Sequence, residues 1–428
     1  MRMQAIGNGS LRARIPAPFA AVMQALQLHG ADTTILRSLR DEEWRGLLPI
    51  IDRSRLALPL AQQAISGLPC WIRERLGNNL ADTARHWELV RAAYREAVAT
   101  LDANGVEYLI LKGFTQAPDF VLRPELRWQG DIDFYVPRKH VPVAVRALQE
   151  IGYASCYGEE NYRHADHVPT LVRFGAWQWK GNFYDPKVPP AVEVHFCLWN
   201  NSVSSIAIEE IEEFWDRRSL RRLGNLTFPA LHPVDHAGYF ALHILRNIFM
   251  AESPVHPMRE LATFLDLRAS DDDFWKEWTK MHSPRLRSMQ AIAFSLAIAW
   301  FSCKQHATVK AEIDSLYPPL RRWIETCGSA PLEVLFRRTR DGRLLQYLLA
   351  DTPVARRKIM AMALHPGRIA GPARVATFGT HPTTTPPKSL LMDRYLGYLA
   401  YLFGRTWLNA SAILRFLAHA VLLRTNQA

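Results

Sequence analysis

The sequence predicts an α+β protein: a short mixed sheet with helices on one side, flanked by N-terminal and C-terminal helical regions. Two observations carry this prediction. Short apolar runs rich in β-branched residues, at Val106 to Leu111 and Ala191 to Phe196, are typical of buried strands. Longer segments before and after these runs repeat apolar residues at the spacing of one helix face. A helix-flanked sheet domain follows from the two patterns together.

The 428-residue chain is long enough for two or three folded domains. Residues 365–388 are rich in proline, glycine and threonine, which is typical of a mobile linker. The helices expected after it could dock onto the body, lie on a membrane surface or bind a partner. The expected divisions are a helical lead-in at 1–103, a core at 104–230, a helical domain at 231–364, the linker at 365–388, and apolar and basic helices at 389–428.

The lead-in is expected to be mainly helical and to support the sheet. It ends at Asn104-Gly105, a turn signal in front of the first strand. Its apolar stripes at helical spacing are Trp44, Leu47, Leu48 and Ile51, followed by Leu89, Ala93, Ala97 and Leu101.

Within and after the core, we expect a helix from Val141 to Ile151 and another from Arg259 to Leu267, with Glu260 on its surface. Phe174, Trp177 and Trp179 are expected in a strand hairpin. A helix also begins near Pro233, since proline is favoured at the first helical position. His236 and His243 lie on that helix, seven residues apart and on one face. A metal site on a helix usually has histidines at positions i and i+4, a spacing that these two do not have. We therefore expect both histidines to pack against neighbouring residues.

Asp131-Ile132-Asp133 is the most informative short motif in the chain. Residues i and i+2 of a strand point to the same face and lie about 6.5–7 Å apart. Two carboxylates directed at one point repel each other unless a cation lies between them. Magnesium prefers carboxylates together with substrate phosphates. The motif therefore predicts a magnesium site on Asp131 and Asp133.

A third carboxylate, Glu193, lies on the strand that begins at Ala191 and shares a face with His195. If this strand lies beside the one with Asp131 and Asp133, the three carboxylates could hold two metal ions roughly 3.5–4 Å apart. The alternative is an edge strand with a solvated face. Replacing Asp133 by alanine is expected to abolish activity and leave the fold intact, because it relieves carboxylate repulsion.

The turn after the first strand offers groups suited to phosphate. Lys112 can meet phosphate as a point charge, or neutralise a carboxylate structurally. Gly113 lets the backbone approach an anion closely, next to free N–H groups. Arg127 could add a two-pronged contact to a phosphate oxygen.

Leu111-Lys112-Gly113, Arg127, Asp131-Ile132-Asp133 and Gly152-Tyr153, in this order, resemble the uncharacterised bacterial nucleotidyltransferases, a branch of the polymerase-beta-like superfamily. The resemblance runs from about Trp44 to about Leu267. Lys112-Gly113 replaces the Gly-Ser or Gly-Gly pair that is usual elsewhere in the superfamily.

The resemblance implies transfer of a nucleoside monophosphate from an NTP to an acceptor hydroxyl, with release of pyrophosphate. Asp131 and Asp133 would hold Mg²⁺, or Mn²⁺ in its place, on the triphosphate. Glu193 would complete a second metal site and is the candidate for accepting the acceptor's proton. His195 and His243 are expected on the nucleotide side of the cleft.

The acceptor and the base of the NTP have no readable signature. A small molecule or a protein is the first expectation. Transfer to tRNA or another RNA, as in toxin-type relatives, is the second, and a domain that binds NTP or a partner without turnover is the third. Incubating host lysate with labelled NTPs would distinguish these three alternatives, because it would show which class of molecule receives the label.

The composition limits the binding partners, the cysteine chemistry and the cellular location that we expect. The formal charge is 52 − 41 = +11, with excess basic residues between Arg337 and Arg374, which suits nucleotides, nucleic acid or anionic membranes. Five scattered cysteines form no Cys-x-x-Cys pair, so neither a zinc ribbon nor a disulfide framework is expected. The first residues lack a secretory signal and no apolar run reaches membrane-spanning length, so a cytoplasmic protein is expected.

Overall fold

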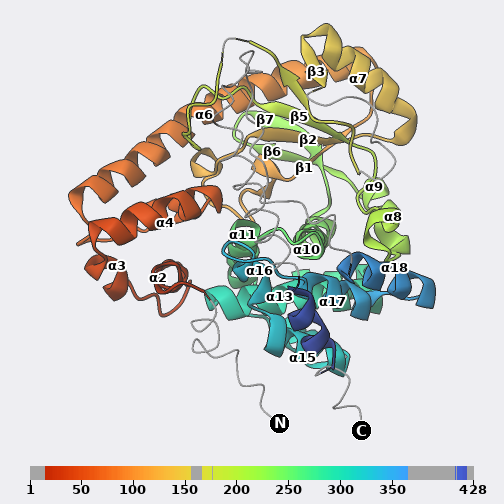
Figure 1. The fold of residues 1–428 in the computed structure, drawn as a ribbon. Helices are drawn as coiled ribbons and strands as arrows, with labels where there is room; N and C mark the ends of the chain where they lie inside the picture. Colours follow the sequence, from red (N-terminus) through yellow and green to blue (C-terminus); the bar gives the residue numbers. More distant parts are fainter. Residues whose placement is uncertain (1–14, 156–165, 176, 365–409, 411, 422–428) are drawn as a thin grey trace, which may run out of the picture.

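The computed structural model describes residues 15–155, 166–175, 177–364, 410 and 412–421 (Figure 1). It has the predicted α+β class, with a mixed seven-stranded sheet, but helices lie on both faces of that sheet rather than on one. The expected linker at 365–388 lies outside the described residues. Of the helices expected after it, residues 412–421 are described and helical.

The sheet has the strand order β3-β4-β5-β2-β1-β7-β6. The pairs β2/β5 and β1/β7 are parallel, and the other neighbouring pairs are antiparallel. The first strand is shorter than expected, because residues 106–108 approach the sheet without pairing. The strands are β1 (Leu109–Leu111), β2 (Asp131–Tyr135), β3 (Tyr153–Ser155), β4 (Leu171–Arg173), β5 (Ala191–His195), β6 (Ser219–Leu223) and β7 (Leu226–Ala230).

The lead-in is helical as expected: α2 (Ala17–Ala25), α3 (Thr34–Ser38), α4 (Asp41–Arg53), α5 (Ala57–Gln62) and the long α6 (Cys70–Ala103). Helix α4 buries the stripe predicted for it. The stripe predicted for α6 is wrong at one position: Leu89 is exposed, while Val90 and Tyr94 take the buried places beside Ala93, Ala97 and Leu101. A long helix drifts relative to any single four-residue spacing, so the buried face moves by one residue.

One face of the sheet is covered by α6 and α7 (Val141–Glu150), which lie above it in Figure 1. Ile132 and Phe134 of β2 and Val192 and Val194 of β5 point into this layer and form one apolar core with the two helices. Because strand side chains alternate, Asp131, Asp133 and Glu193 must face the opposite way. The apolar core thus fixes which face carries the acidic residues.

The opposite face looks toward α10 (Pro233–Phe249) and α11 (Val255–Leu267), which separate the sheet from a lower helical layer (Figure 1). Helix α10 packs on α13 and α17 of that layer. The remaining helices are α8 (Asn201–Ser204), α9 (Glu213–Asp216), α12 (Asp272–Met281), α13 (Pro284–Phe301), α14 (Ala307–Asp314), α15 (Pro318–Cys327), α16 (Ala330–Glu333), α17 (Asp341–Leu349) and α18 (Pro353–Leu364). One apolar cluster joins this layer to α2, α4 and α5.

Two local expectations are wrong. Phe174, Trp177 and Trp179 form no strand; the hairpin in front of β5 is β3 with β4, and Phe174 is exposed. Glu260 is buried on α11 rather than on its surface. Aromatic residues predicted the hairpin because they favour strands, but here Trp177 bonds Asp185 and Trp179 contacts Phe183 in an irregular segment.

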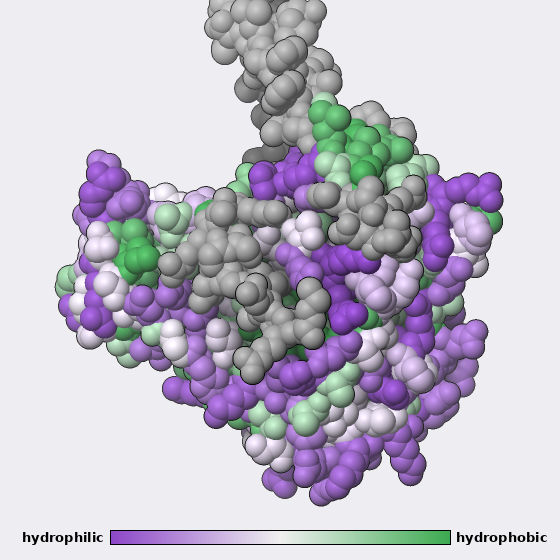
Figure 2. Space-filling view, turned by 90° about the horizontal axis from the view of Figure 1, so that it is seen from below, coloured by the Kyte–Doolittle hydropathy of each residue, from purple (hydrophilic) through white to green (hydrophobic). Residues whose placement is uncertain are grey.

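Viewed from below, the described surface is largely hydrophilic, with compact hydrophobic patches (Figure 2). Helix 412–421 buries Ala412 and Phe416 and exposes Leu414, Leu417 and Val421, so it docks on the body through one face. Among the described residues, no helix combines the length and the apolar composition needed to cross a membrane.

His236 lies in the core at the start of α10. Its ring contacts Phe120, its Nδ1 accepts a hydrogen bond from Arg221 at 3.3 Å, and only 3% of the residue is exposed. Burial first, and then the positive charge of Arg221, lower the pKa of His236 to about 3. The folded protein therefore holds this ring neutral at neutral pH.

We expect His236 to weaken the fold in acid. Its pKa in the folded state lies below the unfolded value, so its contribution is complete above pH 6.5 and is lost as the pH falls toward 3. At pH 4.5 the loss should be roughly 3 kcal/mol. Denaturant unfolding at pH 7.5 and pH 4.5 should show a smaller loss for His236→Gln than for the wild type. Equal losses would contradict this explanation.

Candidate active site

The parallel pairing of β2 with β5 brings the predicted acidic residues together. Asp133 stands opposite Glu193 in the register, and Asp131 lies two residues earlier on β2. The partners in a parallel pair share a face, so all three carboxylates are on the side turned toward α10. Ligand atoms of Asp133, Glu193 and His195 lie within 4.8 Å of one another, a grouping compatible with one metal ion.

Asp133 is neutralised inside the protein by two cations. Lys112 Nζ lies 2.7 Å and His195 Nε2 lies 2.8 Å from the same oxygen, Oδ1. Burial alone would raise the pKa of Asp133, but Lys112 and His195 outweigh it and hold that pKa below its usual range. Removing this carboxylate would take the ion-pair partner from the buried Lys112 and the nearest carboxylate from His195, so the fold of Asp133→Ala is not expected to stay intact.

His195 also joins Asp133 to Glu193. Its Nε2 lies 3.4 Å from Glu193 Oε2, and Thr170 Oγ1 donates a hydrogen bond of 2.9 Å to Glu193 Oε1. Burial lowers the pKa of His195, but its bonds to the two carboxylates raise it to about 9. Burial raises the pKa of Glu193, and His195 and His167 bring it well below its usual range. Glu193 is consequently a weak proton acceptor in this state.

Asp131 differs from the other two carboxylates. It is half-buried, and within the described residues its side chain makes no hydrogen bond or ion pair. Burial, followed by the charges of Asp133 and Glu193, raises the pKa of Asp131 to about 7. Asp131 is therefore the carboxylate whose negative charge has no partner among the described side chains. The repulsion between carboxylates that was expected to act on Asp133 acts on Asp131 instead.

The turn after β1 holds Lys112 and Gly113 in left-handed backbone conformations, with φ of 43° and 59°. A Cβ on Gly113 would lie 2.3–2.7 Å from the side-chain amide of Gln129. That amide donates a 2.7 Å hydrogen bond to the backbone oxygen of Asp131. The glycine thus allows the turn to pack directly against the residue that positions the start of β2.

Arg127 forms an ion pair with Glu260 of α11. Its Nε lies 2.6 Å and its Nη2 lies 3.3 Å from the two carboxylate oxygens, and both side chains are largely buried. Arg127 still lowers the pKa of Asp131 through its charge. In this arrangement Arg127 ties the loop before β2 to α11 and adds positive charge beside the site.

Helix α10 faces the site with Tyr239, His243 and Arg246. Burial first, and then Lys112 and Arg246, bring the pKa of His243 well below its usual value; Asp133 and His195 also act on it. His243 therefore lies within electrostatic reach of Lys112, Asp133 and His195. His236 does not, because seven residues separate the two histidines by about 10 Å along the helix axis.

Three residues of the site had no part in the sequence-based expectations: Tyr239, Arg246 and Asp166. Arg246 forms an ion pair with Asp166, whose other neighbour is His195 Nδ1 at 3.9 Å. Tyr239 and Arg246 lie four residues before and three residues after His243, a helical spacing that could have indicated them. Asp166 has no such signal, because only the fold brings it to β5.

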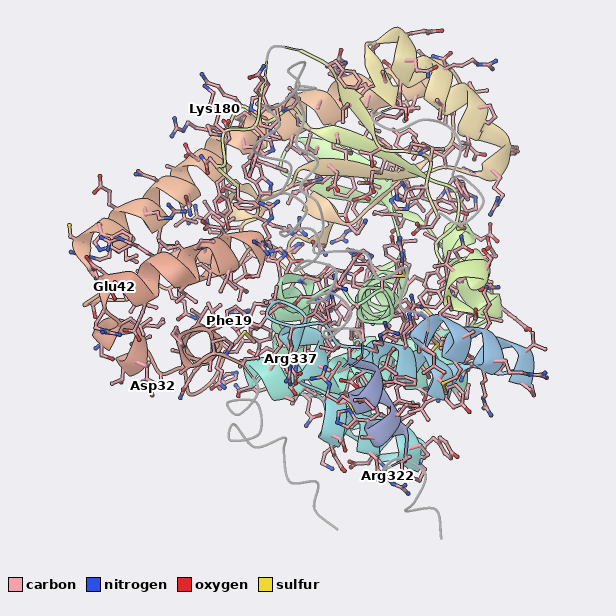
Figure 3. The ribbon with its side chains drawn as sticks, in the orientation of Figure 1. Phe19, Asp32, Glu42, Lys180, Arg322 and Arg337 are labelled. Carbon is pink, nitrogen blue, oxygen red and sulfur yellow. The ribbon has the colours of Figure 1, made fainter. Side chains whose placement is uncertain are left out.

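A cavity of about 160 Å³ opens beside Asp166. It lies where the core meets α8, α10 and α17, and side chains fill the surrounding space between the sheet and the lower helices (Figure 3). Its lining includes Asp166, His167, Trp199, Arg246, Met250 and Arg343.

We expect Gly113→Ala to destabilise the protein more than Gly105→Ala. Gly105 has a similar φ of 64°, but no atom lies within 4 Å of the place that a Cβ would take, so it reports backbone strain alone, about 1 kcal/mol. Gly113→Ala adds the collision with Gln129, costing roughly 1–3 kcal/mol more. Denaturant unfolding of both variants measures the difference. Equal losses would show that Gln129 moves aside freely.

Comparison with known proteins places the chain in a family. No curated protein and no solved structure matches it. A family model described as an uncharacterised nucleotidyltransferase matches residues 40–302, which include the whole sheet together with α10 and α11. The chain therefore belongs to this nucleotidyltransferase family.

Proposed function

We propose that the chain transfers a nucleoside monophosphate from an NTP to a hydroxyl group of a small-molecule acceptor and releases pyrophosphate. The observation that carries this proposal is the register of β2 with β5, which sets Asp133 opposite Glu193 with Asp131 on the same face. The acceptor oxygen forms a bond to the α-phosphorus while the bond from that phosphorus to pyrophosphate breaks.

The residues present fit magnesium. Their donors are carboxylate oxygens, and the raised pKa of Asp131 reflects buried negative charge that a cation would compensate. Asp131, Asp133 and Glu193 would hold the ion or ion pair, with Mn²⁺ as a substitute and His195 as an added ligand or a support for the carboxylates. When bound, such ions would neutralise charge that develops on the phosphoryl oxygens.

The chain's own residues would bind and orient the nucleotide. Lys112, once its ammonium leaves Asp133, would contact a phosphate oxygen, and the backbone at Gly113 allows close approach. Arg127 would contribute positive charge while bound to Glu260, and His243 lies on the α10 side of the same cleft. In the metal-free site Asp131 takes up a proton more readily than Glu193, because its pKa is raised to about 7 and that of Glu193 is lowered.

The cavity beside Asp166 supports a small acceptor over an RNA. Three helices bound this cavity. Asp166 lines it and also lies 3.9 Å from His195 Nδ1. Arg343 lines it: its guanidinium donates to Gln346 Oε1 at 2.7 Å and, within the described residues, has no carboxylate partner. An acceptor with a hydroxyl group and an anionic group would fit this cavity, with the anionic group bound to Arg343 and the hydroxyl group near Asp166.

Asp131→Asn should abolish transfer without weakening the fold. The substitution keeps the shape and removes the charge that repels Asp133 and Glu193. The metal-free variant should be at least as stable as the wild type, and pyrophosphate release should fall by about a thousandfold. Release is measured with Mg²⁺ and each NTP in turn, using host extract as the source of acceptor.

Asp273→Asn, on an exposed carboxylate of α12, is the matched control and should retain full activity. An Asp131→Asn variant that keeps more than a tenth of the wild-type rate would refute the site.

Arg343→Gln should weaken acceptor use and leave NTP binding unchanged. Loss of one charge-assisted hydrogen bond, worth about 1.5 kcal/mol, should lower labelling about tenfold at limiting extract. The rate should recover at high extract concentration. Label transfer from α-labelled NTP into a small-molecule extract measures this, with the exposed Arg222→Gln on β6 as control. An unchanged rate at limiting extract would remove Arg343 from the acceptor site.

A further inference from the structure

A second cluster of metal-binding residue types lies in the lower helical layer, away from the sheet. It joins Cys327, the last residue of α15, Asp341, the first residue of α17, and His419 of helix 412–421. All three are buried, at 0%, 1% and 9% exposure. Cys327 and His419 lie 92 positions apart in the chain, so only the docking of the last helix assembles the group.

The three side chains converge through single atoms. His419 Nδ1 lies 2.9 Å from Asp341 Oδ1 and 3.4 Å from Cys327 Sγ. One ligand atom from each residue lies within 4.8 Å of the other two. This is the arrangement expected when three donors share one small centre.

Hydrogen bonding satisfies this arrangement only in part. A ring nitrogen carries either one proton or one lone pair in the ring plane. With a proton, Nδ1 donates to Asp341 and cannot accept from the thiol of Cys327. With a lone pair, Nδ1 accepts from the thiol but faces a carboxylate oxygen at 2.9 Å without a proton between them. A cation at the centre would use a lone pair from all three atoms.

The donor set matches zinc. Zinc takes cysteine sulfur at about 2.3 Å, histidine nitrogen at about 2.0–2.1 Å and carboxylate oxygen at about 2.0–2.2 Å. In a tetrahedron, those lengths separate sulfur from nitrogen by about 3.5 Å and nitrogen from oxygen by about 3.3 Å. The observed 3.4 and 2.9 Å need only a small opening of the cluster. A thiolate and a carboxylate also balance the charge of Zn²⁺.

Arg415 holds the carboxylate of Asp341 in place. Arg415 Nη2 lies 3.5 Å from the second oxygen of Asp341, and Arg415 Nη1 lies 3.2 Å from Glu333. Arg337, labelled in Figure 3 beside the last helix, also pairs with Glu333. Asp341 can therefore give Oδ1 to a metal while its other oxygen stays bonded.

We propose that Cys327, Asp341 and His419 bind one Zn²⁺ ion, with water in the fourth position. The ion fastens helix 412–421 to α15 and α17. Helix α17 also carries Arg343 and Gln346, which line the cavity, so the metal fixes one wall of that space. The proposal concerns metal binding alone and does not depend on the transfer reaction.

The test is the metal content of the full-length protein, expressed with added zinc, freed of any purification tag and purified without chelator. We expect about one zinc ion per chain by elemental mass spectrometry, with its loss in Cys327→Ser and in His419→Gln. Cys303→Ser, at another buried cysteine, and Asp131→Asn should both keep the zinc. The second control separates this site from the candidate active site.

Should Cys327→Ser fail to fold, X-ray absorption at the zinc edge of the wild-type protein decides the matter, with one sulfur expected at about 2.3 Å. Cobalt substitution should add a thiolate-to-metal charge-transfer band. Wild-type protein without zinc, zinc retained in Cys327→Ser, or a zinc environment without sulfur would each overturn the proposal.

Discussion

The parallel pairing of β2 with β5 is the constraint on which the candidate site depends. Ile132, Phe134, Val192 and Val194 are buried under α6 and α7, so the alternate residues of both strands must point to the other face. The register then sets Asp133 opposite Glu193. A slip of one residue would bury the carboxylates in the apolar layer, where their desolvation would be prohibitive. Packing on one side of the sheet thus enforces the charge cluster on the other.

Buried charge of one sign must be balanced, and the three carboxylates are balanced unequally. Lys112 and His195 both bind Asp133, and His195 also reaches Glu193. Asp131 is left with repulsion from its neighbours, which raises its pKa to about 7. The protein is therefore stable with two carboxylates held by internal cations, while the third is available for an external cation or a proton. The proposed phosphate-binding role of Lys112 starts from this ion pair.

Helix α10 links this chemistry to the rest of the molecule. Its site-facing side carries Tyr239, His243 and Arg246, and its other sides pack on α13 and α17. Arg246 reaches Asp166, so α10 contributes to both the carboxylate cluster and the cavity beside it. Helix α17 forms another wall of that cavity and begins at Asp341 of the proposed zinc site. Changes in the lower helices can thus reach the cavity without touching the sheet.

The sequence by itself determined the α+β class, the family, the two acidic strands and the faces on which their carboxylates lie, because alternation and turn chemistry are local properties of the chain. It did not determine the partners of those side chains. Arg127 is bound to Glu260, 133 positions away, and Asp166 lies beside His195 because His167 forms a bridge with β5. His236 and His243 share a helix face in the sequence, yet His236 lies in the core beside Phe120 and His243 lies near Lys112 and Asp133. Such pairings depend on how distant elements pack, and short-range periodicity carries no information about that packing.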